Sequence, residues 1–384
     1  MIKSRHKTVS VPETGAPPKK NKLWSVLFVL FNVIAILVIV LMERGHEDKA
    51  DFATVSEVVW KNIGWFLAAL ATYFVALFTE GAGYTNLIVA ITGKIRHGLG
   101  TRLSVVGKYY DNLTPLATGG QPFQVHTLIK RGVAAGEATG IVIIKYLVRQ
   151  LVFNTASIAF LIFSPYRPTP LIIGLACFGS FCLIAIPLFL VFVGFSKGFG
   201  QKLLNGIVGL LAKIRIVKDR EAAVADLNEQ VGIYRSSLLY LFKKKRTLLF
   251  QLLVACVEVA IQFSAPYLVY RAFGMNAAGY FEITTLYVYC ILAVSFVPTP
   301  GTAGAAEASF YTVFSAMITN GTVFWALIAW RLITFYVHIL AGVFLHVRDF
   351  VYKLLYPKAT TDLFSPAEWD DNYGKEETSP TKTE

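Results

Sequence analysis

Long apolar blocks recur along the chain, and they constrain its fold more than any other feature of the sequence. A helix needs about 20 apolar residues to cross a bilayer, and several blocks reach or approach this length. Because hydrocarbon offers no partner for backbone N–H and C=O groups, such blocks are expected to be helical. A membrane barrel would instead show short alternating segments. The predicted spans are Leu23–Met42, Ile63–Leu87, Ala138–Phe163, Leu171–Phe195, Leu248–Tyr270, Ile283–Val297, Ala303–Ile318 and Val323–Leu345.

The basic residues predict how these spans are oriented. The chain has 36 Lys+Arg against 24 Asp+Glu, a formal net charge of +12, but only 16% of its residues are charged. The basic excess lies in short segments between apolar blocks, which favours cytoplasmic loops beside anionic lipid over a nucleic-acid-binding surface. We therefore expect a multi-pass protein of the cytoplasmic membrane with both termini in the cytoplasm and no nucleic-acid partner.

Three regions follow from this pattern. Residues 1–22 are expected to form a basic cytoplasmic N-terminus, residues 23–345 the transmembrane domain, and residues 346–384 a cytoplasmic, mostly disordered tail. Within the domain, residues 197–247 are expected to form a cytoplasmic amphipathic segment on the membrane surface. Its apolar positions at helical spacing are Leu203, Leu204, Ile207, Leu210 and Leu211. The first block is interpreted as a retained span, because acidic and basic residues follow it in place of a cleavage site.

Several kinds of chemistry have no support in the sequence. Cysteines occur only inside apolar stretches and without CxxC spacing, and the six histidines are scattered. No GxxxxGK[ST] motif is present, so any transport is expected to be downhill or ion-coupled. We predict no metal, no cofactor and no catalytic residue.

Two breaks interrupt the apolar pattern at the expected depth of the membrane. In the first, Pro115 ends a helix, Gly119 and Gly120 permit unusual backbone angles, and Pro122 suits the start of a new helix. In the second, Pro298, Pro300 and Gly301 end a helix and a new one begins near Gly304. The sequence therefore predicts an all-α fold, a polytopic membrane helix bundle of about 7–8 spans with two interrupted or re-entrant helical elements. Two ordinary turns outside the membrane remain the alternative.

Broken helices inside a bilayer indicate a transport site. Their unpaired backbone groups survive only when buried in protein or beside a wet cavity, and their N-termini attract anions such as phosphate. Two such elements in separate parts of a chain are typical of transporters.

Ionisable residues inside the apolar blocks point to the same conclusion. Lys145 and Arg149 lie four residues apart, on one face of the third span, and Glu258 and Arg331 lie deep in later spans. Each such charge costs roughly 2.5–3.5 kcal/mol at the bilayer centre, so several together imply pairing or a polar pathway. A location near a helix end, with the charged group reaching the interface, is the alternative for Lys145 and for Glu80.

The two breaks also carry a family resemblance. The stretch from Asn112 through Gln124, followed by Lys130–Arg131–Gly132, resembles the flippase-like membrane region of the lysylphosphatidylglycerol synthase family. The stretch from Pro298 to Glu307 resembles the second motif of that family, and the resemblance covers about Leu23–Leu345. Many relatives carry Arg shortly after the paired glycines, where this chain has Gln121 and Gln124.

The resemblance implies lipid translocation. In full-length members the membrane region moves lysylphosphatidylglycerol to the outer leaflet, and a soluble domain makes it from lysyl-tRNA and phosphatidylglycerol. Only residues 346–384 follow the last predicted span, so we expect no transferase domain in this chain.

The leading hypothesis is a flippase-like protein that translocates or binds a phospholipid with a cationic or zwitterionic headgroup. Amide side chains would supply hydrogen bonds, Arg149 or Arg331 and the helix N-termini would hold phosphate, and Glu258 and Glu307 would bind an aminoacyl ammonium. A separate lipid-modifying enzyme is a further candidate partner. The candidate cavity residues are Asn112, Pro115, Gly119, Gly120, Gln121, Gln124, Lys145, Arg149, Glu258, Pro298, Pro300, Gly301, Gly304, Glu307 and Arg331.

Two alternatives remain. One is a phosphatidylglycerol lysyltransferase or another membrane-embedded transferase acting on a lipid carrier, although the sequence has no DxD pair and no Cys/His nucleophile arrangement. The other is a scaffold for envelope enzymes. Enzyme activity and oligomeric state are therefore left open.

Overall fold

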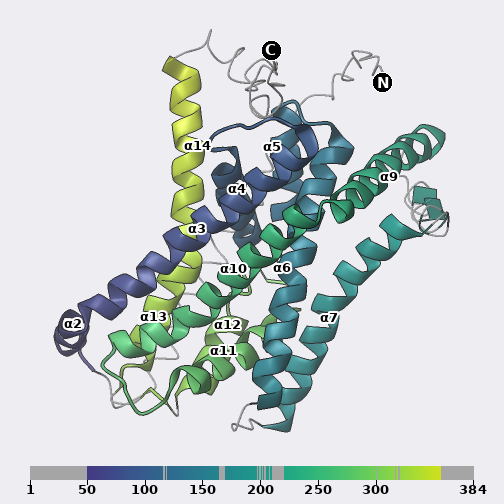
Figure 1. The fold of residues 1–384 in the computed structure, drawn as a ribbon. Coiled ribbons are helices and arrows are strands. Elements are labelled where there is room, and N and C mark those ends of the chain that lie inside the picture. The colour runs from purple at the N-terminus through teal and green to yellow at the C-terminus, as the bar shows by residue number, and fades with distance from the viewer. Residues whose placement is uncertain are drawn as a thin grey trace, which may run out of the picture. The chain divides into compact units, whose positions relative to one another are not determined.

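The computed structural model describes residues 50–355 except 116, 118, 164–168, 197, 199, 201, 203–204, 207, 210–219, 300, 316 and 319–320. All regular elements in this part are helices (Figure 1). In chain order they are α2 (Phe52–Lys61), α3 (Ile63–Thr92), α4 (Leu99–Leu113), α5 (Gly120–Lys130), α6 (Ala135–Phe163), α7 (Pro170–Phe195), α9 (Arg220–Lys243), α10 (Lys245–Ala272), α11 (Tyr280–Val294), α12 (Ala305–Phe314), α13 (Val323–Arg331), the π-helix η1 (Leu332–Tyr336) and α14 (Val337–Leu355).

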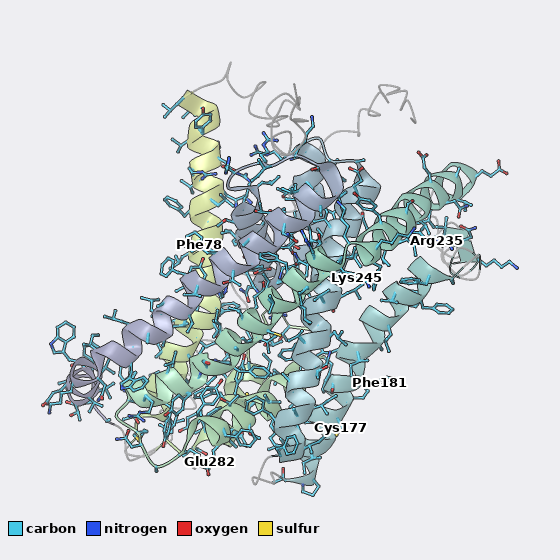
Figure 2. All side chains as sticks on the ribbon, in the orientation of Figure 1. Phe78, Cys177, Phe181, Arg235, Lys245 and Glu282 are labelled. Atoms are coloured by element: carbon cyan, nitrogen blue, oxygen red, sulfur yellow. The ribbon has the colours of Figure 1, made fainter. Side chains whose placement is uncertain are left out.

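The predicted all-α membrane architecture is confirmed at this level. Four described helices are long and apolar enough to cross a membrane: Ile63–Thr92, Ala135–Phe163, Lys245–Ala272 and Val323–Tyr352. Many large apolar side chains face outward, among them Phe78 on α3 and Phe181 on α7 (Figure 2). Apolar side chains on the outer surface are expected where helices contact lipid. Because lipid tails are as apolar as the protein interior, moving such side chains from lipid into the protein brings no hydrophobic gain.

Some predicted features lie outside the described residues. These are the basic segment 1–22, the first predicted span Leu23–Met42, Pro300, most of the tail, and the apolar positions Leu203, Leu204, Ile207, Leu210 and Leu211.

Two elements depart from the expected boundaries. The last helix continues past the predicted end at Leu345 to Leu355, because apolar residues continue along it and Asp349 pairs with Arg102 of α4. In the segment 197–247, α9 packs against α6 and buries Leu238 in a core cluster with Leu87 and Leu128. Part of that segment therefore belongs to the helix bundle.

Helices α3, α6 and α10 form the centre that positions the polar residues. Helices α3 and α10 are antiparallel, since Lys244 Nζ donates to the Ala90 carbonyl (2.9 Å) at one end while the rings of Trp65 and Tyr267 lie 6.5 Å apart at the other. Helix α6 runs parallel to α10. The end of the bundle that contains Lys94, Arg96, Arg131 and Lys243–Arg246 is called the basic end below.

Helices α4 and α5 form a hairpin that starts and finishes at the basic end. Arg96, just before α4, donates to the carbonyl of Arg131, just after α5 (3.4 Å). Midway along the hairpin, Gln124 Nε2 donates to the Leu103 carbonyl (2.9 Å). The connection between Leu113 and Gly120 is therefore the tip of this first hairpin, and it lies toward the middle of the bundle.

Helices α11 and α12 form a second hairpin that runs in the opposite direction. Helix α11 begins beside the far end of α10, where the hydroxyls of Tyr280 and Ser264 are 3.1 Å apart. After the break, α12 turns back along α11, so that Ser309 lies beside Cys290. In Figure 1, α4 and α5 occupy the upper half of the bundle, while α11 and α12 occupy the lower half.

Candidate functional site

The tips of the two hairpins meet inside the bundle. A Cβ atom added to Gly301, in the second tip, would lie 3.3 Å from the backbone oxygen of Asn112, in the first. The same atom would collide with the ring of Phe335 on η1. Gly301 has φ +56°, a conformation that favours glycine, so a residue without a side chain is required both by the backbone and by the neighbours.

Parts of both tips remain exposed. Pro115 in the first tip and Pro298 and Gly304 in the second are exposed. Gly120 at the start of α5 and Val294 at the end of α11 are buried. The structure therefore places the two predicted breaks next to each other, with surface around them on which a ligand can contact the backbone.

The first polar group is the Glu258 cluster, formed by Lys145 and Arg149 of α6, Glu258 and Gln262 of α10, and Tyr287 of α11. Lys145 Nζ lies 2.5 Å from Glu258 Oε1, with side chains 3% and 5% exposed, and Arg149 Nε lies 3.6 Å from Glu258 Oε2. Arg149 also donates to Gln262 (2.6 Å), which in turn donates to the Tyr287 hydroxyl (3.3 Å). Three residues predicted from the sequence thus form one network, in which Lys145 and Glu258 are buried and Arg149 is partly exposed.

The second group is the Glu307 cluster, which holds the second tip in place. Arg331 Nε lies 2.6 Å from Glu307 Oε1, and Arg331 also donates to the Gly301 carbonyl (3.3 Å). The other Glu307 oxygen accepts from the backbone N–H of Gly304 (2.6 Å) and so caps α12. One arginine therefore fixes both sides of the break.

The third group is the Glu80 cluster, between α3, α4 and α14. Ser104 donates to Glu80 Oε2 (2.8 Å), and Lys108 Nζ lies 3.8 Å from the same oxygen. His338 of α14 lines the same small cavity. Nearby on α4, Asp111 accepts from the backbone N–H of Gly120 at the start of α5 (2.8 Å).

The three clusters act on one another electrostatically. The carboxylate of Glu80 interacts with the charges of Lys145 and Arg149, and Tyr287 interacts with both Arg149 and Arg331. Within these clusters and the adjacent Asp111, carboxylates and basic groups balance in number when His338 is counted as neutral. The acids are Glu80, Asp111, Glu258 and Glu307, and the bases are Lys108, Lys145, Arg149 and Arg331.

The half-helix N-termini were expected to hold a phosphate group. In the structure a carboxylate contacts each of them: Asp111 at Gly120 and Glu307 at Gly304. A carboxylate satisfies the same partial positive charge that a phosphate would. A bound phosphate would therefore have to displace an internal carboxylate or bind to the basic side chains instead.

The remaining predicted residues have local roles at the first tip. Gln124 is buried and bonded to the Leu103 carbonyl, so it joins the two helices of the first hairpin. The N–H of Gly119 donates to Thr114 Oγ1 (2.8 Å), which shapes the turn. Asn112 and Gln121 are half-buried near the tip. Of the predicted set, they are the amide side chains left available to a ligand.

A groove of about 410 Å³ runs along the surface of α3 and the start of α4. Its lining combines apolar Phe78 and Val89 with polar Thr85, Asn86 and Thr101. Asn86 accepts a hydrogen bond from Gln251 of α10 (3.0 Å), which also donates to the Gly83 carbonyl. A Cβ added to Gly83, between the groove residues Ala82 and Thr85, would lie 2.9 Å from Lys145 Cε, so this part of α3 packs against the Glu258 cluster.

Sequence reasoning missed several members of the site. Asp111 directly precedes Asn112 and Lys108 lies one helical turn before it, so their place beside a break was a usable signal. Ser104, Gln262, Tyr287 and His338 carried no such signal, because an isolated polar residue in an apolar helix does not reveal its partner.

Comparisons with known proteins identify what the whole chain is similar to. Residues 23–342 match the family model described as the lysylphosphatidylglycerol synthase TM region. A UPF0104 membrane protein from Archaeoglobus fulgidus is 26% identical over 302 residues, which cover 75% of this chain and 89% of that protein.

Proposed function

Because the chain belongs to the lysylphosphatidylglycerol synthase transmembrane-region family, we propose that it is a flippase-like protein of the cytoplasmic membrane. Its substrate would be a phospholipid with a zwitterionic or cationic headgroup, of the lysylphosphatidylglycerol type or related to it. The observation that carries the proposal is the meeting of two opposed helical hairpins beside a buried, charge-balanced group of side chains.

The proposed topology has both hairpins re-entering the bilayer. The first hairpin enters from the cytoplasmic side, because its base contains Arg96 and Arg131 and lies at the basic end. The second enters from the outer side, and the termini are cytoplasmic. Interrupted helices that meet near the midplane are the usual site of substrate binding in secondary transporters.

The proposed mechanism is an exchange of ionic partners. A lipid phosphate would replace Glu258 as the partner of Lys145 and Arg149, and the ammonium of the headgroup would take up the released carboxylate. Since each internal charge is exchanged for one of the same sign, the headgroup would cross without leaving an uncompensated buried charge. The groove along α3 would accommodate apolar parts of the lipid.

Transport in reconstituted vesicles tests the proposal. We expect purified protein to move labelled phospholipids with an ammonium-bearing headgroup faster than protein-free vesicles, and Glu258→Gln and Lys145→Met to abolish the gain. Glu57→Gln, an exposed change on α2, is the matched control and should behave as wild type. A wild-type rate equal to that of protein-free vesicles across a headgroup panel would contradict the proposal.

Lipid analysis of the same preparation addresses the alternative function. A membrane-embedded transferase would produce a new lipid species when this chain alone is expressed, and a separate lipid-modifying enzyme would then not be needed. The flippase proposal expects an unchanged lipid composition.

A further inference from the structure

One face of α6 carries buried polar side chains beyond the Glu258 cluster. They are Gln150, Asn154 and Ser157, called the polar line below, and they are 5%, 5% and 0% exposed. Their spacing of four and three residues places them in a row about 10 Å long on one face of the helix. Helix α6 runs from the basic end to the far end of the bundle (Figure 1), so the polar line leads from the neighbourhood of Arg149 toward the far end.

Each side chain of the polar line has a polar atom without a hydrogen-bond partner in the described part of the chain. The atoms are Gln150 Nε2, Asn154 Oδ1 and Ser157 Oγ. Asn154 Nδ2 donates to the backbone carbonyl of Gln150 (2.9 Å), so the nitrogen side of this amide is satisfied while its oxygen side is not. Polar side chains in membrane helices commonly bond to a neighbouring helix. The unpaired atoms make no such bond to the described residues, so helix association does not account for them.

The polar line lies between two apolar sides of α6. On one side, the ring of Phe153 is 5.6 Å from that of Phe263 on α10. On the other side, Leu151, Ile158 and Ile162 are exposed on the outer surface. The polar line is about a quarter turn around the helix from each of them. A headgroup on the polar line would therefore lie inside the protein, with the surrounding lipid close enough to hold its acyl chains.

The chemistry of the polar line suits a headgroup that carries both signs of charge. Gln150 Nε2 is a donor, Asn154 Oδ1 is an acceptor, and the hydroxyl of Ser157 can be either. A phosphate requires donors and an ammonium requires acceptors, so a zwitterionic headgroup finds partners for both ends. Because these groups are uncharged, they bind weakly enough to let the headgroup leave again, as a conduction path requires.

We propose that Gln150, Asn154 and Ser157 form an uncharged hydrogen-bonding path along which the lipid headgroup passes between the Glu258 cluster and the outer end of the bundle. The path is closed in the structure, so passage requires a neighbouring helix to move away from the polar line. The unpaired atoms then bond to the headgroup or to water that accompanies it. This inference rests on the proposed lipid transport.

An apolar replacement separates a path from a structural role. A buried polar atom without a partner destabilises the fold, so Asn154→Leu should keep or raise the thermal midpoint in detergent. Transport of the same labelled lipids should fall by about ten-fold, because the moving headgroup loses a hydrogen bond. Asn154→Ser retains a polar group and should keep most of the transport.

Thr155→Val is the matched control on the same helix. The hydroxyl of Thr155 is exposed and already donates to the Leu151 carbonyl (2.9 Å), so this variant should transport lipid as wild type does. Wild-type transport by Asn154→Leu would overturn the proposal, because the amide would then be dispensable. A clear loss of thermal stability in Asn154→Leu would also overturn it, because the amide would then hold the fold together.

Thiol accessibility tests the path without any transport measurement. In a background without the native cysteines, full-length protein in phosphatidylcholine nanodiscs would be treated with a small water-soluble methanethiosulfonate. A thiol reacts as its thiolate, which requires water at the site. Ser157→Cys should therefore react at least about ten-fold faster than Ile144→Cys, a position on the same helix that is 2% exposed and lies in an apolar cluster.

The two assays distinguish the path from the function on which it rests. Equally slow reaction of Ser157→Cys and Ile144→Cys would overturn the path and leave the flippase proposal intact. A wild-type protein that moves no lipid of the headgroup panel would overturn both.

Discussion

Lys145 and Glu258 show how a charged residue can persist inside a membrane helix. Their side chains are 3% and 5% exposed, and each is the nearest countercharge of the other. Removing one partner of a buried pair leaves an uncompensated charge, whereas replacing both with apolar residues is often neutral. The presence of this pair is therefore weak evidence that it stabilises the fold and stronger evidence for a function that requires charged groups.

A double replacement separates these roles. We expect Glu258→Leu alone to lower the free energy of unfolding by about 3–5 kcal/mol, because Lys145 would be buried without its partner. The combination Lys145→Met with Glu258→Leu should recover most of that loss but still fail to transport lipid. Thermal unfolding in detergent checks the first expectation and vesicle transport the second. A double variant as unstable as the single one would show that the pair itself stabilises the fold.

At the scale of elements, the two hairpins owe their shape to prolines and glycines near the breaks. Pro115 and Pro298 mark the ends of α4 and α11, and Gly301 permits the left-handed turn of the second tip. Glycines also allow the first hairpin to dock, since a Cβ on Gly100 would collide with the Gly81 carbonyl of α3. Close approach through small residues is how helices commonly pack within bilayers.

Alanine at Gly301 measures the contact between the tips. The substitution should cost about 1–2 kcal/mol for the left-handed backbone and about 1–3 kcal/mol more for the collision with Phe335. Gly93→Ala is the control, because Gly93 also has a positive φ (+71°) but open space around it. If both variants lose equal thermal stability, the proposed packing of the second tip against η1 is wrong.

Labelling from each side of the membrane tests the orientation of the hairpins. In a background without the native cysteines, Lys130→Cys at the base of the first hairpin should react with an impermeant thiol reagent only from the cytoplasm. Asn276→Cys, exposed just before α11, should react only from outside. Labelling of both positions from the same side would exclude two hairpins of opposite direction in the membrane.

At the scale of the whole molecule, an ion pair joins the first hairpin to the last helix. Arg102 of α4 contacts Asp349 of α14, and Arg348 donates to the same carboxylate (3.1 Å). Several positive charges lie close together there. Burial, together with the neighbouring charges of Arg102 and Arg96, lowers the pKa of Arg131 to about 10. The carboxylate of Asp349 thus compensates part of the positive charge of these arginines.

A charge swap measures this connection. Asp349→Arg alone should lower the thermal midpoint, because it adds another cation to the basic surface. Adding Arg102→Asp should restore part of the loss, since the swapped pair regains opposite charges. The pair is partly exposed, so we expect a coupling energy of about 1 kcal/mol that weakens with salt. Purely additive effects in the double-mutant cycle would mean that α14 is held by apolar packing alone.

The sequence by itself determined the helices, because their cause is local. An apolar run in hydrocarbon must satisfy its own backbone, so the predicted spans Ala138–Phe163 and Leu171–Phe195 lie within one to three residues of α6 and α7. It also indicated where α4 and α11 stop, since the effect of a proline or glycine reaches only the adjacent turn, but not that the last helix continues to Leu355. Lys145, Arg149, Glu258 and Arg331 were identified in the same way, as charges that an apolar helix does not tolerate without a partner.

Only the tertiary structure decided which partner each charge has and that the two breaks touch. Arg331 binds Glu307, 24 residues earlier along the chain, while Glu258 binds two basic residues of α6, and neither choice follows from spacing. Glu80, Ser104 and His338 come together from three helices around one cavity. Such contacts depend on how helices pack across long stretches of chain, and helical periodicity fixes the face on which a residue lies but not the helix it faces.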